Sequence, residues 1–402
     1  MQPVGDRSRT FTAALAGFWL LAVALPLGGS LLLARAFGGW PLAGVLVWFG
    51  LLRFARWLSP AARADRLTHK GKYLDALDLC DRALGVSGNV AWTGPRRLVW
   101  LNRRTTLLLS VGRTADALTS ALEALALHPD PETLGNCAFV LVRLNRYNEG
   151  IGAARLAFSV TRERSVISHA ALALANLARG LPAEAEALAH AGLEDASALL
   201  PFVRPDHYVT CLAALARAAR LQCRPPVRHP AEEPARPTRM PADDAAREYD
   251  KLERAAHYLH RLQRAAGASP LARAMALVEE ADGLCAHFVE RDHAYHLLDT
   301  ATQLAPGYVF WYLTQPGTFA DCKDDPRFLQ MHAVAVDHML GMGNTAPDRQ
   351  MVALALTTAQ QTAVARPGRQ TSPQAMTMQL VTLTATFLLL TLWAWRFVLP
   401  GP

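Results

Sequence analysis

Residues 112–129 read GRTADALTSALEALALHP, and this stretch decides the fold class. Gly112 can end a helix, because glycine takes the left-handed backbone conformation without strain. Ala117, Ala121 and Ala124 then follow at intervals of about one helical turn, and Pro129 ends the run. Small residues on one face let a second helix lie close against the first, so Ala117 and Ala121 are expected to be almost fully buried. The stretch predicts two packed helices that meet at Gly112, in an all-α protein.

The same pattern recurs along the middle of the chain. Its copies begin at Gly71, Gly112, Asn145 and Gly180, and a later copy covers residues 294–306. The second and third copies begin 33 residues apart, and the third and fourth 35. The first two begin 41 residues apart, which indicates an insertion near residues 86–95. Because one hairpin cannot bury its apolar face alone, the copies predict stacked hairpins.

This pattern resembles the tetratricopeptide repeat (TPR), whose period is 34 residues. The resemblance covers roughly residues 61–306 and is clearest in the first two copies, although Thr114 and Pro182 stand where the family has an aromatic residue. It implies a helical-hairpin solenoid with a concave groove that holds other proteins or peptides. A generic alanine-rich helical bundle is the alternative.

The first helix of each hairpin would line the groove. By this phase, the residues expected to bind a partner are Asn102, Thr106, Leu109, Asn136, Phe139, Arg143, Leu174 and Leu177. Asparagine and arginine can hold a peptide backbone or a carboxylate, with apolar pockets between them. The alternative is that these side chains only pack or face solvent.

Three long apolar runs predict transmembrane helices, two N-terminal and one C-terminal, which makes the lipid bilayer the second expected partner. Residues 11–34 and 36–52 predict a helical hairpin within 11–58, and residues 377–399 predict the third helix, since about 20 residues span a bilayer. Tryptophans such as Trp48 and Trp395 lie near the ends of the runs, as is typical of membrane interfaces. A cleaved signal peptide is the alternative for the first run, because Arg7 and Arg9 precede it.

Arginines beside these runs predict the orientation. Arg53 and Arg56 follow the second run, and Arg366 and Arg369 precede the third. Positively charged flanks stay in the cytoplasm. We therefore expect a multi-pass protein of a bacterial inner membrane, with residues 1–10 and the repeats on the cytoplasmic side. The high hydrophobic share of 51% and the net charge of +7 agree with this expectation.

The rest of the chain divides by composition. TPR-like repeats are expected over 59–221, a proline-rich linker over 222–242, and further repeats with a C-terminal cap over 243–340. Residues 341–376 are expected to form a tether to the last transmembrane helix, with a short helix near residues 351–365.

Patterns that carry chemistry are missing from the sequence. It contains no known catalytic motif, so we expect no enzyme, no cofactor and no small-molecule substrate. The best metal candidate, Cys285 with His287, Glu290, His293 and His296, fits the surface of the last hairpin equally well, and no metal is expected. No basic aromatic stripe or zinc-finger spacing indicates nucleic acid.

Together these features predict a membrane-anchored cytoplasmic scaffold or adaptor that mediates protein–protein interaction or complex assembly. The alternative is an accessory subunit of a membrane transport or envelope-synthesis machine, in which the transmembrane helices themselves work. Charged residues inside the apolar runs would favour that alternative, and only Arg35, at the turn between the first two runs, is present.

Overall fold

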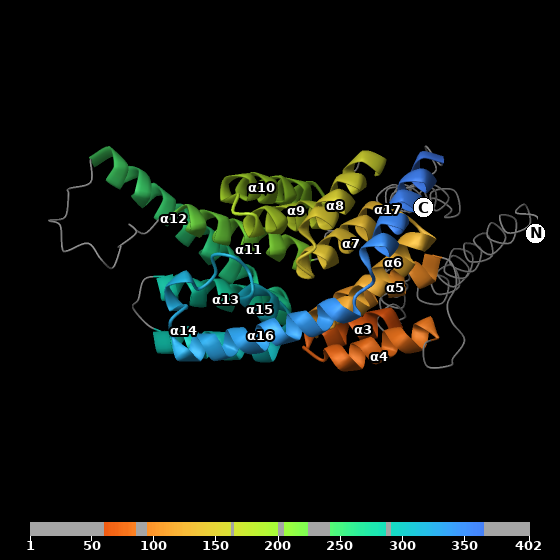
Figure 1. Cartoon of the computed structure of the whole chain (residues 1–402), viewed down its shortest axis with the longest axis horizontal. Coiled ribbons are helices and arrows are strands. Elements are labelled where there is room, and N and C mark those ends of the chain that lie inside the picture. The colour runs from red at the N-terminus through yellow and green to blue at the C-terminus, as the bar shows by residue number, and fades with distance from the viewer. Residues whose placement is uncertain are drawn as a thin grey trace, which may run out of the picture. The chain divides into compact units, whose positions relative to one another are not determined.

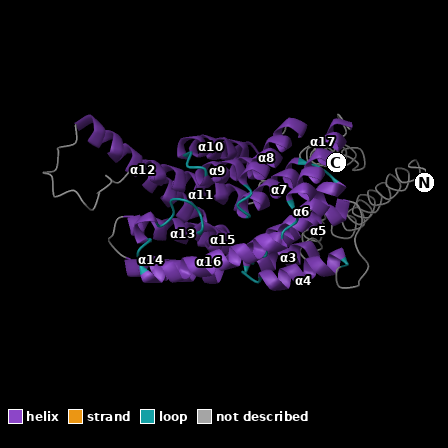
Figure 2. Cartoon of the chain, in the orientation of Figure 1, coloured by secondary structure: helices purple, strands orange, loops and turns teal. Residues whose placement is uncertain are grey.

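The computed structural model describes residues 60–85, 95–161, 165–199, 205–223, 242–286 and 291–365. Every regular element in these ranges is a helix (Figures 1 and 2), which confirms the all-α class. The helices are α3 (Pro60–His69), α4 (Tyr73–Leu84), α5 (Pro95–Ser110), α6 (Thr114–Leu127), α7 (Pro131–Arg143), α8 (Tyr147–Thr161), α9 (Val166–Ala178), α10 (Pro182–Leu199), α11 (Pro205–Gln222), α12 (Ala242–Ala265), α13 (Pro270–Ala286), α14 (Arg291–Leu304), α15 (Pro306–Leu313), α16 (Pro326–Thr345) and α17 (Arg349–Ala365), with short 3-10 helices η1 (Ala266–Ala268) and η2 (Ala320–Cys322).

The helices fall into two compact units, one with α3 and α4 and the other with α5 to α17. Within the described ranges, no helix combines the length and the apolar character that a membrane crossing requires. The three apolar runs, 11–34, 36–52 and 377–399, lie outside the described residues, as does nearly all of the proline-rich stretch 222–242. The three transmembrane helices therefore stay a prediction.

Four helical hairpins share one turn geometry. They pair α3 with α4, α5 with α6, α7 with α8, and α9 with α10. The turn residues Gly71, Gly112, Asn145 and Gly180 have positive φ angles of 73°, 82°, 60° and 75°. After each, the next amide donates to a carbonyl five residues back, in the bonds Lys72–Leu67, Arg113–Leu108, Arg146–Leu141 and Leu181–Asn176, all 2.8–2.9 Å long. Asparagine replaces glycine once because its short side chain tolerates the left-handed conformation.

Small residues on the second helix of each hairpin let the helices lie close together. Ala117 and Ala121 are 0% exposed, which confirms their expected burial. In the third hairpin Gly150 takes the place of alanine, and a Cβ there would lie 2.8 Å from a methyl group of Val142 and 3.0 Å from the Ala138 carbonyl oxygen. The recurring small positions are therefore set by the distance between neighbouring helices.

Successive hairpins stack within the larger unit. The first helices α5, α7, α9, α11 and α13 each contact the next one along the chain, and the pairs α11–α12 and α13–α14 continue the hairpin arrangement. Capping side chains fix where some helices begin. Asp130 accepts a hydrogen bond of 2.7 Å from the Thr133 amide at the start of α7, and Ser165 accepts one of 3.4 Å from the Ser168 amide at α9.

The last three helices return to the beginning of this stack. Helix α15 contacts α5, α16 contacts α6, and α17 contacts α6 and α8; Figure 1 shows α17 beside α6. The short helix predicted near residues 351–365 is α17, and it packs against α6 and α8; that 341–376 tethers a transmembrane helix stays a prediction. Helix α17 packs there because Val352, Leu356 and Ala359 form an apolar stripe at helical spacing, and Val352 and Ala359 are buried.

Candidate protein-interaction surfaces

The eight side chains predicted to line a groove lie on three successive first helices, α5, α7 and α9. All are buried except Thr106, which is partly exposed. Their partners in the structure belong to the same chain.

The two asparagines bond to each other between α5 and α7. The Asn136 side-chain amide donates to the Asn102 side-chain oxygen at 3.3 Å, and the Asn102 amide donates to the Thr133 hydroxyl at 3.4 Å. Thr106 donates its hydroxyl to the Asn102 carbonyl at 3.1 Å, within α5. These groups connect two adjacent helices, which satisfies polar atoms that would otherwise be buried without partners.

Arg143 holds the first turn of α15. Its guanidinium carbon lies 4.9 Å from the ring centre of Trp311 and 5.3 Å from that of Tyr308. Its Nη2 donates to the Gly307 carbonyl. Burial lowers the pKa of Arg143 to about 10, so the side chain stays charged at neutral pH. A buried cation between two aromatic rings and a carbonyl is a strong, directional contact.

Two further arginines, Arg217 and Arg220, contact residues that follow in the same segment. The Arg217 guanidinium carbon lies 4.9 Å from the Tyr312 ring centre, and Arg217 donates to the Pro316 carbonyl at 3.1 Å. Arg220 pairs with Glu279 at 3.1 Å and Asp282 at 2.6 Å. Burial raises the pKa of Glu279, and Arg220 opposes that rise by favouring the charged form.

One of the eight predicted residues, Arg143, thus contacts the chain's own residues 307–311. Arg143 grips a backbone carbonyl, as was expected of a groove arginine, but the carbonyl is that of Gly307. Trp311, Tyr312 and Phe319 are at most 1% exposed. Displacing this segment would expose large aromatic surfaces, so it is part of the core. Partner binding by the eight predicted residues stays a prediction.

The proposed metal ligands are only partly covered by the structure. Cys285 is buried in α13, His293 and His296 are exposed on α14, and His287 and Glu290 lie outside the described residues. Among the residues whose positions the structure gives, no three histidine, cysteine or acidic side chains are close enough together to hold a metal ion.

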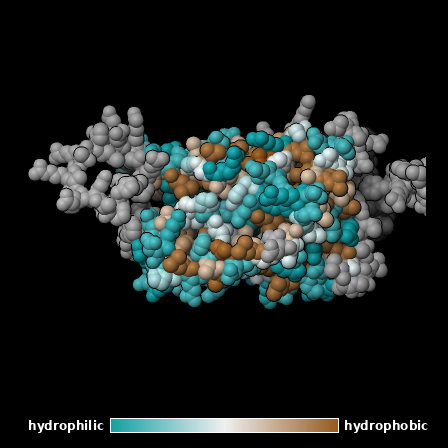
Figure 3. Space-filling model, in the orientation of Figure 1, coloured by the Kyte–Doolittle hydropathy of each residue, from teal (hydrophilic) through white to brown (hydrophobic). Residues whose placement is uncertain are grey.

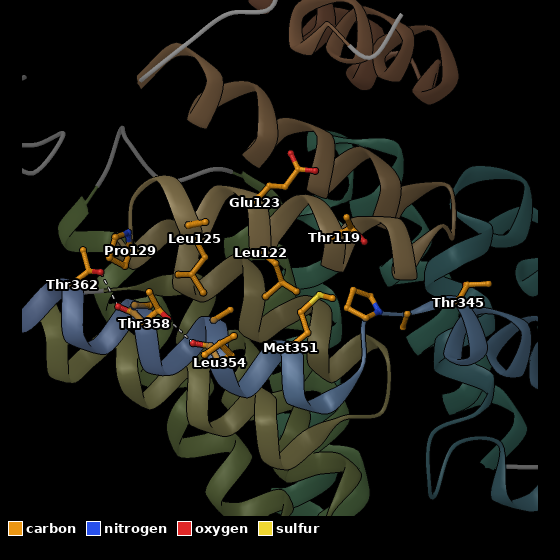
Figure 4. Close-up of a pocket in the computed structure, with 15 residues that line it drawn as sticks. Thr119, Leu122, Glu123, Leu125, Pro129, Thr345, Met351, Leu354, Thr358 and Thr362 are labelled. Atoms are coloured by element: carbon orange, nitrogen blue, oxygen red, sulfur yellow. Dashed lines mark hydrogen bonds between the residues drawn. The ribbon is translucent and has the colours of Figure 1, made fainter. Parts of the chain in front are cut away.

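A pocket of about 600 Å³ lies between α6 and α17. It is lined by Thr119, Leu122, Glu123, Leu125, Ala126 and Pro129 on one side and by Thr345, Ala346, Pro347, Met351, Leu354, Ala355, Thr358, Ala359 and Thr362 on the other. Figure 4 shows Leu122 and Met351 pointing into the space between the helices and Glu123 pointing away from α17. The pocket is therefore an apolar groove. Sequence reasoning missed it because the helix predicted near residues 351–365 was not expected to pack against α6.

Hydrophobic side chains are also exposed on α16 and α17. Leu354 is 69% exposed and Met351 54%, and on α16 Leu329, Val334 and Leu340 are each more than half exposed. Figure 3 shows the brown hydrophobic surface along α16, interrupted by hydrophilic residues. Exposed apolar groups gathered on neighbouring helices are typical of protein or membrane contact surfaces.

No protein-family model matches the chain, and no curated protein matches it significantly.

Proposed function

We propose that this protein is a membrane-anchored scaffold or adaptor of the TPR type, which holds other proteins at the cytoplasmic face of a bacterial inner membrane. The observation that carries the proposal is the turn geometry shared by four hairpins, with a left-handed residue at Gly71, Gly112, Asn145 and Gly180. Stacked hairpins of this kind offer extended surfaces for other proteins.

The surfaces described above support a binding role. The groove between α6 and α17 is apolar, and large hydrophobic side chains stay exposed on α16 and α17. Exposed apolar patches raise the free energy of a monomer in water, and a bound partner would lower it by covering them. Anchoring is supported by the sequence, through the three apolar runs and the arginines that flank them.

Two measurements on the full chain test the proposal. A reporter enzyme that works only outside the cytoplasm should be silent when fused after Leu221 and active when fused after Pro402. The protein should also stay in the membrane fraction during alkaline carbonate extraction. An active reporter after Leu221, or release by carbonate, would show that the proposed anchoring is wrong.

The binding role requires a separate measurement. The full chain, tagged at its native expression level and solubilised in mild detergent, should co-purify with a protein at a reproducible stoichiometry. The matched control is the Ala117→Glu variant, whose hairpin should open because Ala117 is fully buried against the neighbouring helix. A partner that is recovered with both proteins, or with neither, would contradict a scaffold that binds through folded hairpins.

A further inference from the structure

Two buried cysteines meet where α13 contacts the segment that precedes α16. Cys285 lies in the last turn of α13, and Cys322 is the last residue of the short helix η2. Both side chains are 0% exposed, and both thiols are free. The two helices contact each other, and the thiols are hydrogen-bonded to one another. The cysteines are 37 positions apart in the chain, so no short sequence motif joins them.

A buried hydrogen bond fixes how the two helices meet. The Asp282 carboxylate of α13 accepts a bond of 2.7 Å from the Phe319 amide. Cys285 follows Asp282 by three residues, and Cys322 follows Phe319 by three. Residues three apart lie on the same face of an α-helix and are eclipsed in a 3-10 helix. The bond at Asp282 therefore places the two cysteines on the sides of α13 and η2 that meet.

The backbone is strained in the turn that holds Cys322. Phe319 has a φ of 46° and a ψ of 37°, a left-handed conformation that bulky residues rarely adopt. Its ring is 1% exposed and packs against the rings of Tyr312 and Phe328, whose centres are 6.2 and 5.6 Å away. Such a conformation persists only where the surrounding contacts impose it. The contacts of Phe319 thus hold the turn, and with it the Cys322 thiol, against α13.

We infer that Cys285 and Cys322 are a disulfide-forming pair, which low-molecular-weight disulfides such as glutathione disulfide oxidise. One cysteine thiolate attacks the oxidant and displaces a glutathione thiolate. The other cysteine thiolate then attacks the protein sulfur of this mixed disulfide and displaces the second glutathione. The two protein thiols give up two electrons and two protons, and glutathione disulfide is reduced to two molecules of glutathione. The inference does not depend on the proposed scaffold function.

Burial makes this oxidation slow in the folded protein. Burial raises the pKa of the Cys285 thiol, so little of it is the thiolate that attacks a disulfide. Cys322 lies between Asp321, which is partly exposed, and Lys323, which is exposed. A local opening of this short turn therefore brings Cys322 to solvent. We expect the disulfide to form over hours and faster at higher pH, and the pair to stay reduced in a reducing compartment.

The disulfide should stabilise the folded chain. It would fasten residues 319–322 to α13 and close a long loop, which reduces the conformational entropy of the unfolded chain. For a loop of this length in a unit of this size, the melting temperature should rise by roughly 5–10 °C.

Mass spectrometry on the full chain tests the inference. The detergent-solubilised protein is held below its melting temperature with glutathione disulfide at about pH 8, near the ordinary pKa of a thiol. It is then treated with N-ethylmaleimide and digested without reductant. The main disulfide should join the peptides that contain Cys285 and Cys322. Thermal denaturation before and after oxidation measures the rise in melting temperature.

Two alanine variants separate the disulfide from a general effect of cysteine replacement. Cys322→Ala should lose both the disulfide and the rise in melting temperature. Cys211→Ala is the matched control, because Cys211 is also 0% exposed and lies in α11. The control should keep both. Far-ultraviolet circular dichroism of the reduced variants and the reduced parent shows whether either replacement disturbs folding.

The decisive result comes from the unmodified chain, so it does not require that either variant folds. The inference is overturned if the folded parent forms no disulfide between Cys285 and Cys322 under these conditions. It is also overturned if these thiols pair with other cysteines instead, or if their disulfide forms without raising the melting temperature.

Discussion

Replacing Gly307 by alanine should push α15 away from the hairpin turn at Gly112. A Cβ on Gly307 would lie 2.3 Å from the Gly112 Cα, 2.4 Å from the Gly112 nitrogen and 2.8 Å from the Leu109 carbonyl oxygen. All three are backbone atoms, so no side-chain rotation can relieve the clash. The turn is itself held by the bond of 2.8 Å from the Arg113 amide to the Leu108 carbonyl.

The size of the effect follows from two terms. Overpacking by one methyl group typically costs about 1–3 kcal/mol. Moving α15 would also break the hydrogen bond from Arg143 to the Gly307 carbonyl, and bonds to charged groups contribute about 1.5–3 kcal/mol. We therefore expect a loss of about 3–5 kcal/mol. In a unit of this size that corresponds to a drop in melting temperature of roughly 10 °C.

Thermal denaturation of the detergent-solubilised full chain, followed by far-ultraviolet circular dichroism, measures this loss. The matched control is Gly152→Ala in α8, because nothing lies within 4 Å of a Cβ at that exposed position. The control should be as stable as the parent, or more stable by about 0.5–1 kcal/mol, since alanine has a higher helix propensity than glycine. If Gly307→Ala has the same melting temperature as Gly152→Ala, the close approach of α15 to the turn at Gly112 is wrong.

Three further variants are expected to have measurable effects on thermal denaturation. Ala117→Glu should destabilise the α5–α6 hairpin by several kcal/mol, because an unpaired carboxylate would be buried there. Asn136→Ala should cost about 1–2 kcal/mol, since it leaves the buried Asn102 oxygen without its donor. His169→Gln should reduce the loss of stability between about pH 7 and pH 5. Burial lowers the pKa of His169 from 6.5 despite the opposing effect of Asp195, so the unfolded chain binds the proton first and the folded state loses stability as the pH falls below 6.5.

Controls for these variants lie on exposed parts of the same region. Ala126→Glu in α6 and Asn148→Ala in α8 make the same substitutions at exposed positions and should change stability by less than about 0.5 kcal/mol. Equal melting of Ala117→Glu and Ala126→Glu would contradict the hairpin packing. If Asn136→Ala unfolds at the same temperature as the parent, the hydrogen bond from the Asn136 amide to Asn102 contributes nothing to stability. An unchanged pH profile in His169→Gln would show that its burial does not affect its protonation.

The predicted groove residues show which features could be predicted from the sequence and which could not. Asn102, Asn136 and Arg143 lie on successive first helices of the hairpins. Their bonding partners could not be predicted. The Gly307 carbonyl that Arg143 holds lies 164 residues further along the chain. No spacing in the sequence connects two positions that far apart.

The packing of the short helix predicted near residues 351–365 could not be foreseen, for a related reason. Residues 349–365 carry alanines, threonines and glutamines, a composition that fits an exposed segment as well as a packed helix. Only the presence of α6 and α8 beside it turns Val352 and Ala359 into buried residues. The groove between α6 and α17 depends on that packing, so it had no signal in the sequence either.

The sequence by itself determined the helical hairpins, their turns and their buried alanines. These features depend on contacts between residues close in the chain, where helical spacing and the left-handed preference of glycine and asparagine act directly. Only the tertiary structure decided that Arg143 bonds to the Gly307 carbonyl of α15, that His338 of α16 lies 3.1 Å from the Gly112 carbonyl, and that α17 forms the wall of a new groove. Those contacts join residues up to 226 positions apart, and the burial of aromatic and apolar surface over the whole unit selects them.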